Sequence, residues 1–167
     1  MAIRLQRKTE KVGSDDLAGR IAFFLDAHHV MSLATCGPRG PHAANLFYAR
    51  DGLSLLWVSN RQSIHSTNIG INPHVSVTIA PDYNDFDEIC GVQVFGNAHQ
   101  FTDAAERYSA RALLATRYPI LQQLSDKPIL ERAYLSAEPY QLVPDRIVLI
   151  DNRRGFGHRD TLDLQPV

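Results

Sequence analysis

Short apolar runs, each closed by turn residues, fill the N-terminal half of the sequence and constrain its fold most. Residues 30–35 have the composition of a strand, and the Gly-Pro-Arg-Gly-Pro segment at 37–41 predicts a turn. Residues 42–49 return as a second strand, Asp51-Gly52 is a strong hairpin signal, and residues 53–59 form a third strand. Three antiparallel strands in succession indicate a meander or a barrel.

Further strands are predicted beyond this point. Residues 75–79 alternate with the period of a strand, and residues 89–100 form a longer one. Two short strands, 140–143 and 146–151, flank a predicted turn at Pro144-Asp145. The total is six to seven strands.

Helices are predicted on either side of these strands. Ser14 can cap a first helix that ends near His29, and Asp103 begins a second that stops by Tyr118-Pro119. Residues 120–138 are predicted to be partly helical, with Pro128 as a break. The fold class is therefore mainly β with flanking helices.

Size and composition indicate one ordinary domain. The 167 residues carry a formal charge of −1, which offers no basic stripe for nucleic acid or for a membrane surface. We expect a flexible arm over residues 1–13 and a single domain over 14–167. Cys36 and Cys90 lack metal or disulfide spacing, so we expect free thiols and a cytoplasmic location. The histidines show no metal-binding spacing either, and we predict no metal.

The polar stretch from Ser59 to Pro73 stands between two strands and carries the chemistry. It places hydroxyls, Arg61 and His65 directly after an apolar strand. Several donors converging on one point suit a phosphate, and charge-assisted donors bind it most strongly. We predict a phosphate-binding corner held against the sheet.

The order of these elements resembles the FMN-binding split barrel family typified by pyridoxamine 5′-phosphate oxidase. The matching pieces are residues 29–35, Pro41-His42, Ser63 with His65, residues 72–77 and residues 91–98. The segment 150–157 is similar to a small bacterial branch of this superfamily whose members lack an assigned activity.

The resemblance implies a homodimer with FMN in a cleft between the two subunits. Carried over position by position, it makes candidates of strand residues, crossover residues and one residue of the C-terminal segment. The cofactor-binding candidates are Asn45, Leu46, Phe47, Ser59, Asn60, Arg61, Ser63, His65 and Asn152. The flavin would supply the redox chemistry, and the protein would supply position and electrostatics.

The sequence departs from the oxidases where charge matters. His65 stands where the oxidases carry Lys, Ile64 where they carry Arg, and Asn45 where a cation is expected. Arg61 could replace one missing cation, because a guanidinium can grip phosphate in bidentate fashion. The oxidases' substrate-binding Arg-x-His motif is absent, so we reject pyridoxamine phosphate oxidation as the activity.

Each candidate has an ordinary structural alternative. Ser59, Asn60 and Ser63 could simply cap the crossover helix, His65 could be a solvated helix residue, and Arg61 a surface cation. Asn45 is harder to dismiss, because a buried amide on an apolar strand must have its hydrogen bonds met.

Two structural interpretations accompany these candidates. Trp57 falls on the most apolar strand and is expected in the core. The segment 155–157, Gly-Phe-Gly, is expected to approach a partner subunit or the flavin edge.

Two classes of function fit the sequence. The first is an FMN-dependent oxidoreductase that acts on an unidentified small molecule. The second is a module that binds flavin, haem or a deazaflavin without turnover. No residue is an obvious general acid or base, so any catalysis would belong to the flavin.

Overall fold

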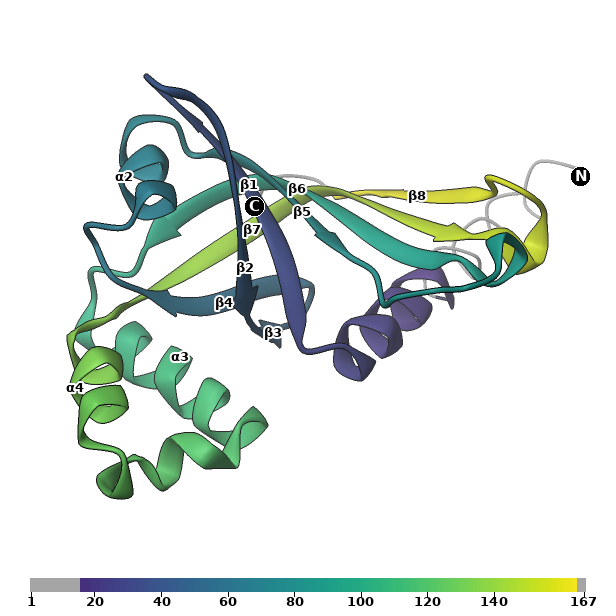
Figure 1. Ribbon diagram of the computed structural model, residues 1–167. Helices are drawn as coiled ribbons and strands as arrows, with labels where there is room; N and C mark the ends of the chain where they lie inside the picture. The colour runs from purple at the N-terminus through teal and green to yellow at the C-terminus, as the bar shows by residue number, and fades with distance from the viewer. Residues whose placement is uncertain (1–15, 165–167) are drawn as a thin grey trace, which may run out of the picture.

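The computed structural model describes residues 16–164 and consists of one antiparallel sheet with helices at its edges (Figure 1). The hydrogen-bonded order is β2-β1-β5-β6-β7-β4-β3, and β8 pairs with β7. The strands are β1 (Val30–Gly37), β2 (Gly40–Phe47), β3 (Ala49–Asp51), β4 (Ser54–Ser59), β5 (His74–Ile79), β6 (Cys90–Gln100), β7 (Glu138–Asp151) and β8 (Arg159–Asp163). The predicted mainly β, antiparallel split barrel is confirmed.

Helices connect and cover these strands. The first helix spans residues 16–27. The others are α2 (Ile64–Ile71), α3 (Ala104–Arg117) and α4 (Pro128–Ser136), with short 3-10 turns at η1 (Phe86–Glu88), η2 (Pro119–Gln122), η3 (Leu124–Asp126) and η4 (Asn152–Arg154). Figure 1 shows α2 near one end of the long strands and the β7–β8 turn at the other.

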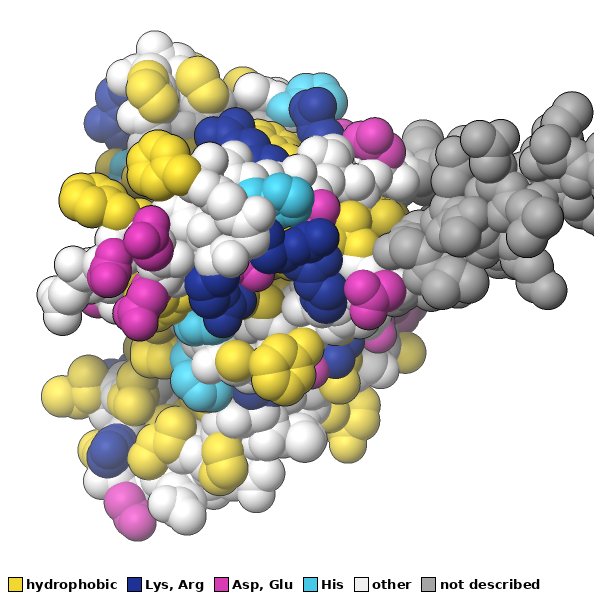
Figure 2. All heavy atoms as spheres, turned by 90° about the vertical axis from the view of Figure 1, so that its right-hand side faces the viewer, with side chains coloured by type: hydrophobic (Ala, Val, Ile, Leu, Met, Phe, Trp, Pro, Cys, Tyr) yellow, Lys and Arg dark blue, Asp and Glu magenta, His cyan; other side chains and the backbone are white. Residues whose placement is uncertain are grey.

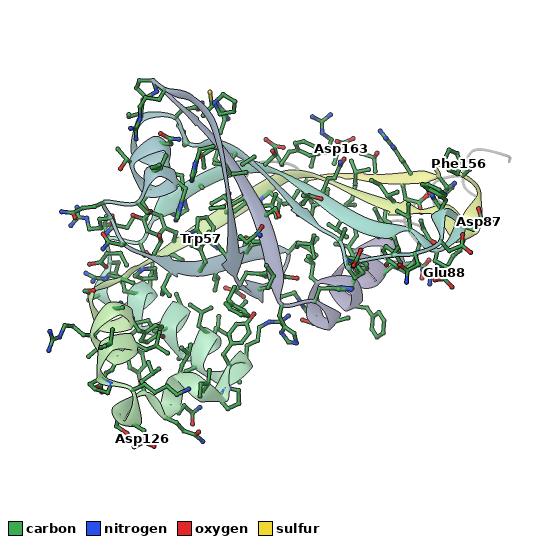
Figure 3. The ribbon with its side chains drawn as sticks, viewed as in Figure 1. Trp57, Asp87, Glu88, Asp126, Phe156 and Asp163 are labelled. Atoms are coloured by element: carbon green, nitrogen blue, oxygen red, sulfur yellow. The ribbon has the colours of Figure 1, made fainter. Side chains whose placement is uncertain are left out.

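The curved sheet encloses an apolar core that the first helix helps to close. Leu17, Ile21, Phe24 and Leu25 of this helix are buried in the core, at the helical spacing that the sequence predicts. The proposed cap at Ser14 and the arm over residues 1–13 lie outside the described residues. Trp57 is fully buried, as predicted, and stacks on Tyr140 with ring centroids 5.7 Å apart (Figure 3).

The pairing of the early strands differs from the predicted meander. β1 and β2 form a hairpin, and so do β3 and β4, but β4 pairs with β7 rather than with β2. The second predicted strand, 42–49, is divided into β2 and β3, which lie at opposite ends of the sheet path. Only residues 38 and 39 are left for the β1–β2 turn.

The predicted turn at Pro144-Asp145 is wrong. β7 runs unbroken from Glu138 to Asp151 and contains a β-bulge, where Phe95 pairs with Arg146 and the next residue, Gly96, pairs with Pro144. From Tyr140 to Pro144 the buried residues are even-numbered, and from Ile147 onward they are odd-numbered. An extra residue in the strand, and not a chain reversal, accounts for the turn-like sequence.

Three further features differ from expectation or extend it. Pro128 begins α4 instead of breaking a helix, since proline at the first helical position loses no hydrogen bond there. On α3 the buried residues are Ala110 and Leu114, and Tyr108 is exposed. We predicted no strand for residues 159–163, which form β8.

No helix in the part of the chain from residue 16 to 164 has the length and hydropathy needed to cross a membrane.

Candidate functional site

Four polar side chains gather where β4 ends and α2 begins. Ser59 is the last residue of β4, and Ser63 is the N-cap of α2, whose side chain accepts a hydrogen bond from the Ser66 amide. His65 and Ser66 belong to the first turn of that helix. We call Ser59, Ser63, His65 and Ser66 the hydroxyl–imidazole cluster.

The members of the cluster are joined by short hydrogen bonds. His65 Nε2 lies 2.6 Å from Ser59 Oγ and 3.1 Å from Ser63 Oγ, and the two hydroxyls are themselves 3.1 Å apart. Ser63 Oγ donates to Ser66 Oγ over 2.8 Å. The cluster therefore brings three hydroxyl groups and one imidazole to a single point beside the N-terminus of α2, which favours anions.

His65 is buried, which excludes the alternative of a solvated helix residue. Only 7% of it is exposed. Burial lowers the pKa of its imidazole, and the nearby His42 lowers it further, so His65 is neutral at pH 7. The two imidazole rings are nearly parallel, with centroids 6.2 Å apart and 9° between the planes.

A second buried polar contact fixes α2 against β1. Asn68 is buried, and its Nδ2 donates to Thr35 Oγ1 over 3.1 Å. Its Oδ1 lies against Gly37, where a β-carbon would fall only 2.0 Å away. This packing sets the position of α2 relative to β1, and with it the position of the cluster.

Asn60 and Arg61 occupy the loop between β4 and the cluster. Both are exposed, and the Asn60 side chain accepts a hydrogen bond from the Gln62 amide over 2.8 Å. The capping alternative is therefore realised for Ser63, whereas the Asn60 side chain shapes the loop that precedes α2. Ser63 also contacts Ser59 and His65, so capping and cluster membership coexist in one side chain.

The strand candidates Asn45, Leu46 and Phe47 do not join the cluster within one chain. Asn45 and Phe47 are exposed on the outer face of β2, whereas Leu46 packs against the core. The expected burial of Asn45 is wrong: β2 is an edge strand, and the Asn45 amide oxygen accepts a hydrogen bond from the Ser32 hydroxyl over 2.7 Å.

Asn152 lies at the opposite end of the long strands, in η4. It is buried, its Nδ2 donates to the Phe86 carbonyl over 2.6 Å, and its Oδ1 accepts from the Gly157 amide over 3.0 Å. Within one chain Asn152 therefore holds two loops together. Phe156, beside Gly157, is 81% exposed at the tip (Figure 3).

Two cavities flank the cluster. One, of about 400 Å³, lies between α2 and the β1–β2 turn and is lined by His42, Gln62 and Asn68 among others. The other, of about 560 Å³, lies between Ser59, Asn60 and the apolar residues of α4. The cluster itself borders the second cavity, through Ser59.

A third cavity, of about 570 Å³, is at the far end, beside Cys90 and Arg153. Figure 2 shows basic side chains beside carboxylates on this face. Arg153 pairs with Asp151, and Arg20 and Arg154 both pair with Asp160. Since these arginines are already engaged, the far cavity is less suited to an anion than the cluster. Residues 16–164 contain no group of three or more metal-binding side chains.

Comparison with known proteins identifies the family. The sequence matches the pyridoxamine 5′-phosphate oxidase family over residues 17–139. The chain belongs to this family. A UPF0306 protein from Serratia proteamaculans is 31% identical over 140 residues, covering 83% of this chain and 89% of the relative. The resemblance inferred from residues 29–98 is confirmed, and so is the likeness to an uncharacterised bacterial branch.

Solved structures share the fold of this oxidase family member. The conserved hypothetical protein Rv2991 from Mycobacterium tuberculosis superimposes with a TM-score of 0.69 at 23% identity, over 89% of this chain and 91% of that one. A haem-binding protein from Mycobacterium smegmatis gives a TM-score of 0.68 at 22% identity, over 87% of this chain and 57% of that one. At these identities the likeness establishes the fold.

Sequence reasoning did not single out His42 and Ser66 as site residues. His42 meets His65 only because the β1–β2 hairpin folds over α2, a contact across 23 positions that no local pattern encodes. Ser66 carried a usable signal: it stands three residues after the N-cap Ser63, where a helix turn brings side chains together.

Proposed function

We propose that the protein is an FMN-binding flavoprotein whose cofactor phosphate is held at the hydroxyl–imidazole cluster. The observation that carries the proposal is the convergence of Ser59, Ser63 and His65 within 3.1 Å of one another at the start of α2, in a chain of the oxidase family. A bound flavin would accept or donate electrons or hydride, and we propose an oxidoreductase acting on an unidentified small molecule.

The residues fit a phosphate in donor type. Ser59 and Ser63 can donate from their hydroxyls, and the amides of Ile64 and His65 at the start of α2 have no acceptor inside the helix. Arg61 is exposed beside them and can swing toward a phosphate. The chain's part is to bind and orient the cofactor, and the exposed edge of β2 offers backbone groups for the polar rim of the flavin ring.

We propose further that two copies form a homodimer that completes the site. The support is the outer face of β1 and β2, where Val30 and Phe47 pair in register and are 44% and 64% exposed. Small side chains such as Ala34 and Ala43 lie on the same face. A flat face with apolar and small residues suits self-association, and it also carries Asn45.

An absorption spectrum of the purified protein tests cofactor binding. Excess FMN is added, unbound flavin is removed by gel filtration, and the protein peak is examined for flavin bands. Retained flavin in the peak supports the proposal. A colourless protein contradicts it, and a Soret band after addition of haem would favour the haem-binding alternative.

Site-directed variants test the position of the phosphate site. The Ser63→Ala, His65→Ala double variant should lose flavin retention while its circular dichroism spectrum stays unchanged. Thr116→Ala is the matched control, because it removes a hydroxyl from the exposed face of α3 that hydrogen-bonds only within its own helix. Unchanged retention in the double variant would place the phosphate elsewhere.

Light scattering coupled to gel filtration tests the dimer. Ala43→Arg on the outer face of β2 should convert the dimer to a monomer and release FMN. Ser125→Arg, on an exposed 3-10 turn, introduces the same charge away from that face and should leave both unchanged. A monomeric wild-type protein that retains FMN would contradict the shared site.

A further inference from the structure

The cluster combines a buried neutral histidine with a shortage of permanent positive charge. His65 is hydrogen-bonded to Ser59 and Ser63, and its ring faces the ring of His42. In the absence of a ligand, both burial and His42 hold the pKa of His65 below its usual value. Both hydroxyls contact the same nitrogen of the neutral imidazole, Nε2.

An anion placed on these hydroxyls changes this balance. A phosphate oxygen next to His65 favours the imidazolium, because an opposite charge at hydrogen-bond distance stabilises the protonated form. The charged ring would then donate a charge-assisted hydrogen bond, which is about twice as strong as a neutral one. Anion binding and protonation of His65 therefore support each other.

We propose that binding of a phosphate-bearing ligand at the cluster takes up one proton, which His65 carries, so that affinity rises as the pH falls from about 8 to about 6.5. The inference rests on the proposed phosphate site and adds its regulation. The proton on His65 supplies positive charge only when the anion is bound, in place of a permanent cation.

The surroundings of His65 leave few competitors for this proton. His42 on β2 is the one group of residues 16–164 whose charge shifts the pKa of His65. Glu138, which pairs with Ser59 across β4 and β7, is engaged by Arg107 over 2.5 Å. The other charged side chains nearby are Arg39 at the β1–β2 turn and the exposed Arg61 of the loop.

Calorimetry of FMN binding in buffers of different ionisation enthalpy measures the proton directly. At about pH 7 we expect an uptake of roughly one half to one proton per FMN and an affinity that rises up to about tenfold per unit fall in pH. The phosphate of FMN, whose second pKa is near 6, would release protons on binding as a dianion, so it cannot mimic the uptake. Riboflavin, which lacks the phosphate, should show none.

Three variants locate the proton. His65→Lys should bind FMN with little pH dependence and without proton uptake, because its charge is permanent. His65→Gln should bind weakly at every pH and also without uptake. His74→Gln removes an exposed histidine at the start of β5 and should behave as the wild type.

The outcomes separate the two proposals. If the wild type retains no FMN at either pH 6.5 or pH 8, the proposed function fails. If FMN binds but its affinity changes less than about twofold over this range and no proton is taken up, the phosphate site stands and the inference is overturned. Proton uptake that persists in His65→Gln would overturn it as well.

Discussion

Asn68 packs its side-chain amide against the backbone of Gly37, so closely that a β-carbon at position 37 would lie 2.0 Å from Asn68 Oδ1. The same amide donates to Thr35, and this pair of contacts holds α2 on β1. The position of the cluster at the start of α2 therefore depends on the absence of a side chain at residue 37.

Gly37→Ala should lower the free energy of unfolding by about 1–3 kcal/mol, because the new methyl group must displace a buried amide. Urea denaturation followed by circular dichroism measures the change. Gly70→Ala on the exposed face of α2 meets no atom within 4 Å and should stabilise the protein slightly. Adding Asn68→Ala to Gly37→Ala should cost less than the two single changes together; strict additivity would contradict the contact.

Gly96→Ala should be more damaging, because its β-carbon meets backbone rather than a side chain. That carbon would lie 2.1 Å from the Val143 carbonyl oxygen and 2.8 Å from Pro144 Cα, at the bulge between β6 and β7. We expect a loss of about 3 kcal/mol or more, or failure to accumulate as folded protein. Gly19→Ala on the first helix is the control for thermal denaturation, because its β-carbon would meet no atom within 4 Å. Equal melting temperatures of the two variants would show that the backbone at the bulge can move to accommodate the methyl group.

Arg117 joins the end of α3 to the end of the first helix. Its guanidinium donates to the carbonyl oxygens of Leu25, Asp26 and His28, and it lies over the ring of Tyr48. Arg117→Met should cost about 1.5–3 kcal/mol, because these carbonyls lose a charged donor. Arg117→Lys should recover part of this, since an ammonium group cannot span three carbonyls.

Equilibrium unfolding in urea, with Arg132→Met on the exposed face of α4 as the control, measures the contribution of Arg117. Equal stability of Arg117→Met and Arg132→Met would mean that water can hydrogen-bond the carbonyl oxygens at the end of the first helix equally well.

Asp151 makes the stability of the folded state depend on pH. Hydrogen bonds from Arg153, at 2.8 and 3.1 Å, hold the pKa of the Asp151 carboxyl below its usual range. A carboxyl whose pKa is lower in the folded state stabilises above the unfolded pKa of about 3.9, and this stabilisation disappears as the pH falls through the folded value. Arg153 is largely exposed, so the contribution is about 0.5–1 kcal/mol.

Unfolding of Asp151→Asn should therefore require less urea than the wild type at pH 7, and the difference should be smaller at pH 3. Asp126→Asn, on an exposed 3-10 turn, should match the wild type at both values (Figure 3). A deficit of Asp151→Asn that stays constant down to pH 3 would show that packing, rather than charge, is responsible.

Local signals predicted most of the elements. Asp103 does accept hydrogen bonds from the Ala105 and Glu106 amides, and α3 ends at Arg117, immediately before Tyr118-Pro119. The polar residues after β4 correctly predicted a short connection that packs against the sheet. Such features depend on residues a few positions apart, so the sequence alone reports them.

Long-range pairing could not be predicted in this way. Nothing near Ser54–Ser59 indicates that β4 pairs with residues 138–142 rather than with β2. The exposure of Asn45 follows from this topology, because only the full strand order makes β2 an edge. The meeting of His42 with His65 has the same origin, which is why the cluster is richer than the sequence suggested.

The bulge in β7 separates two parts of the strand, in which the inward-facing residues have even numbers before it and odd numbers after it. Leu142 reaches the core from an even position and Ile147 from an odd one, so the extra residue keeps both on the same side of the sheet. Deleting Asp145 would remove the extra residue, and a regular strand without the bulge would keep Leu142, Ile147 and Leu149 on the core side. Chimaeras with relatives should be joined outside residues 143–147, since a crossover that adds one residue there without a further bulge would turn the C-terminal part of β7 to the opposite face of the sheet.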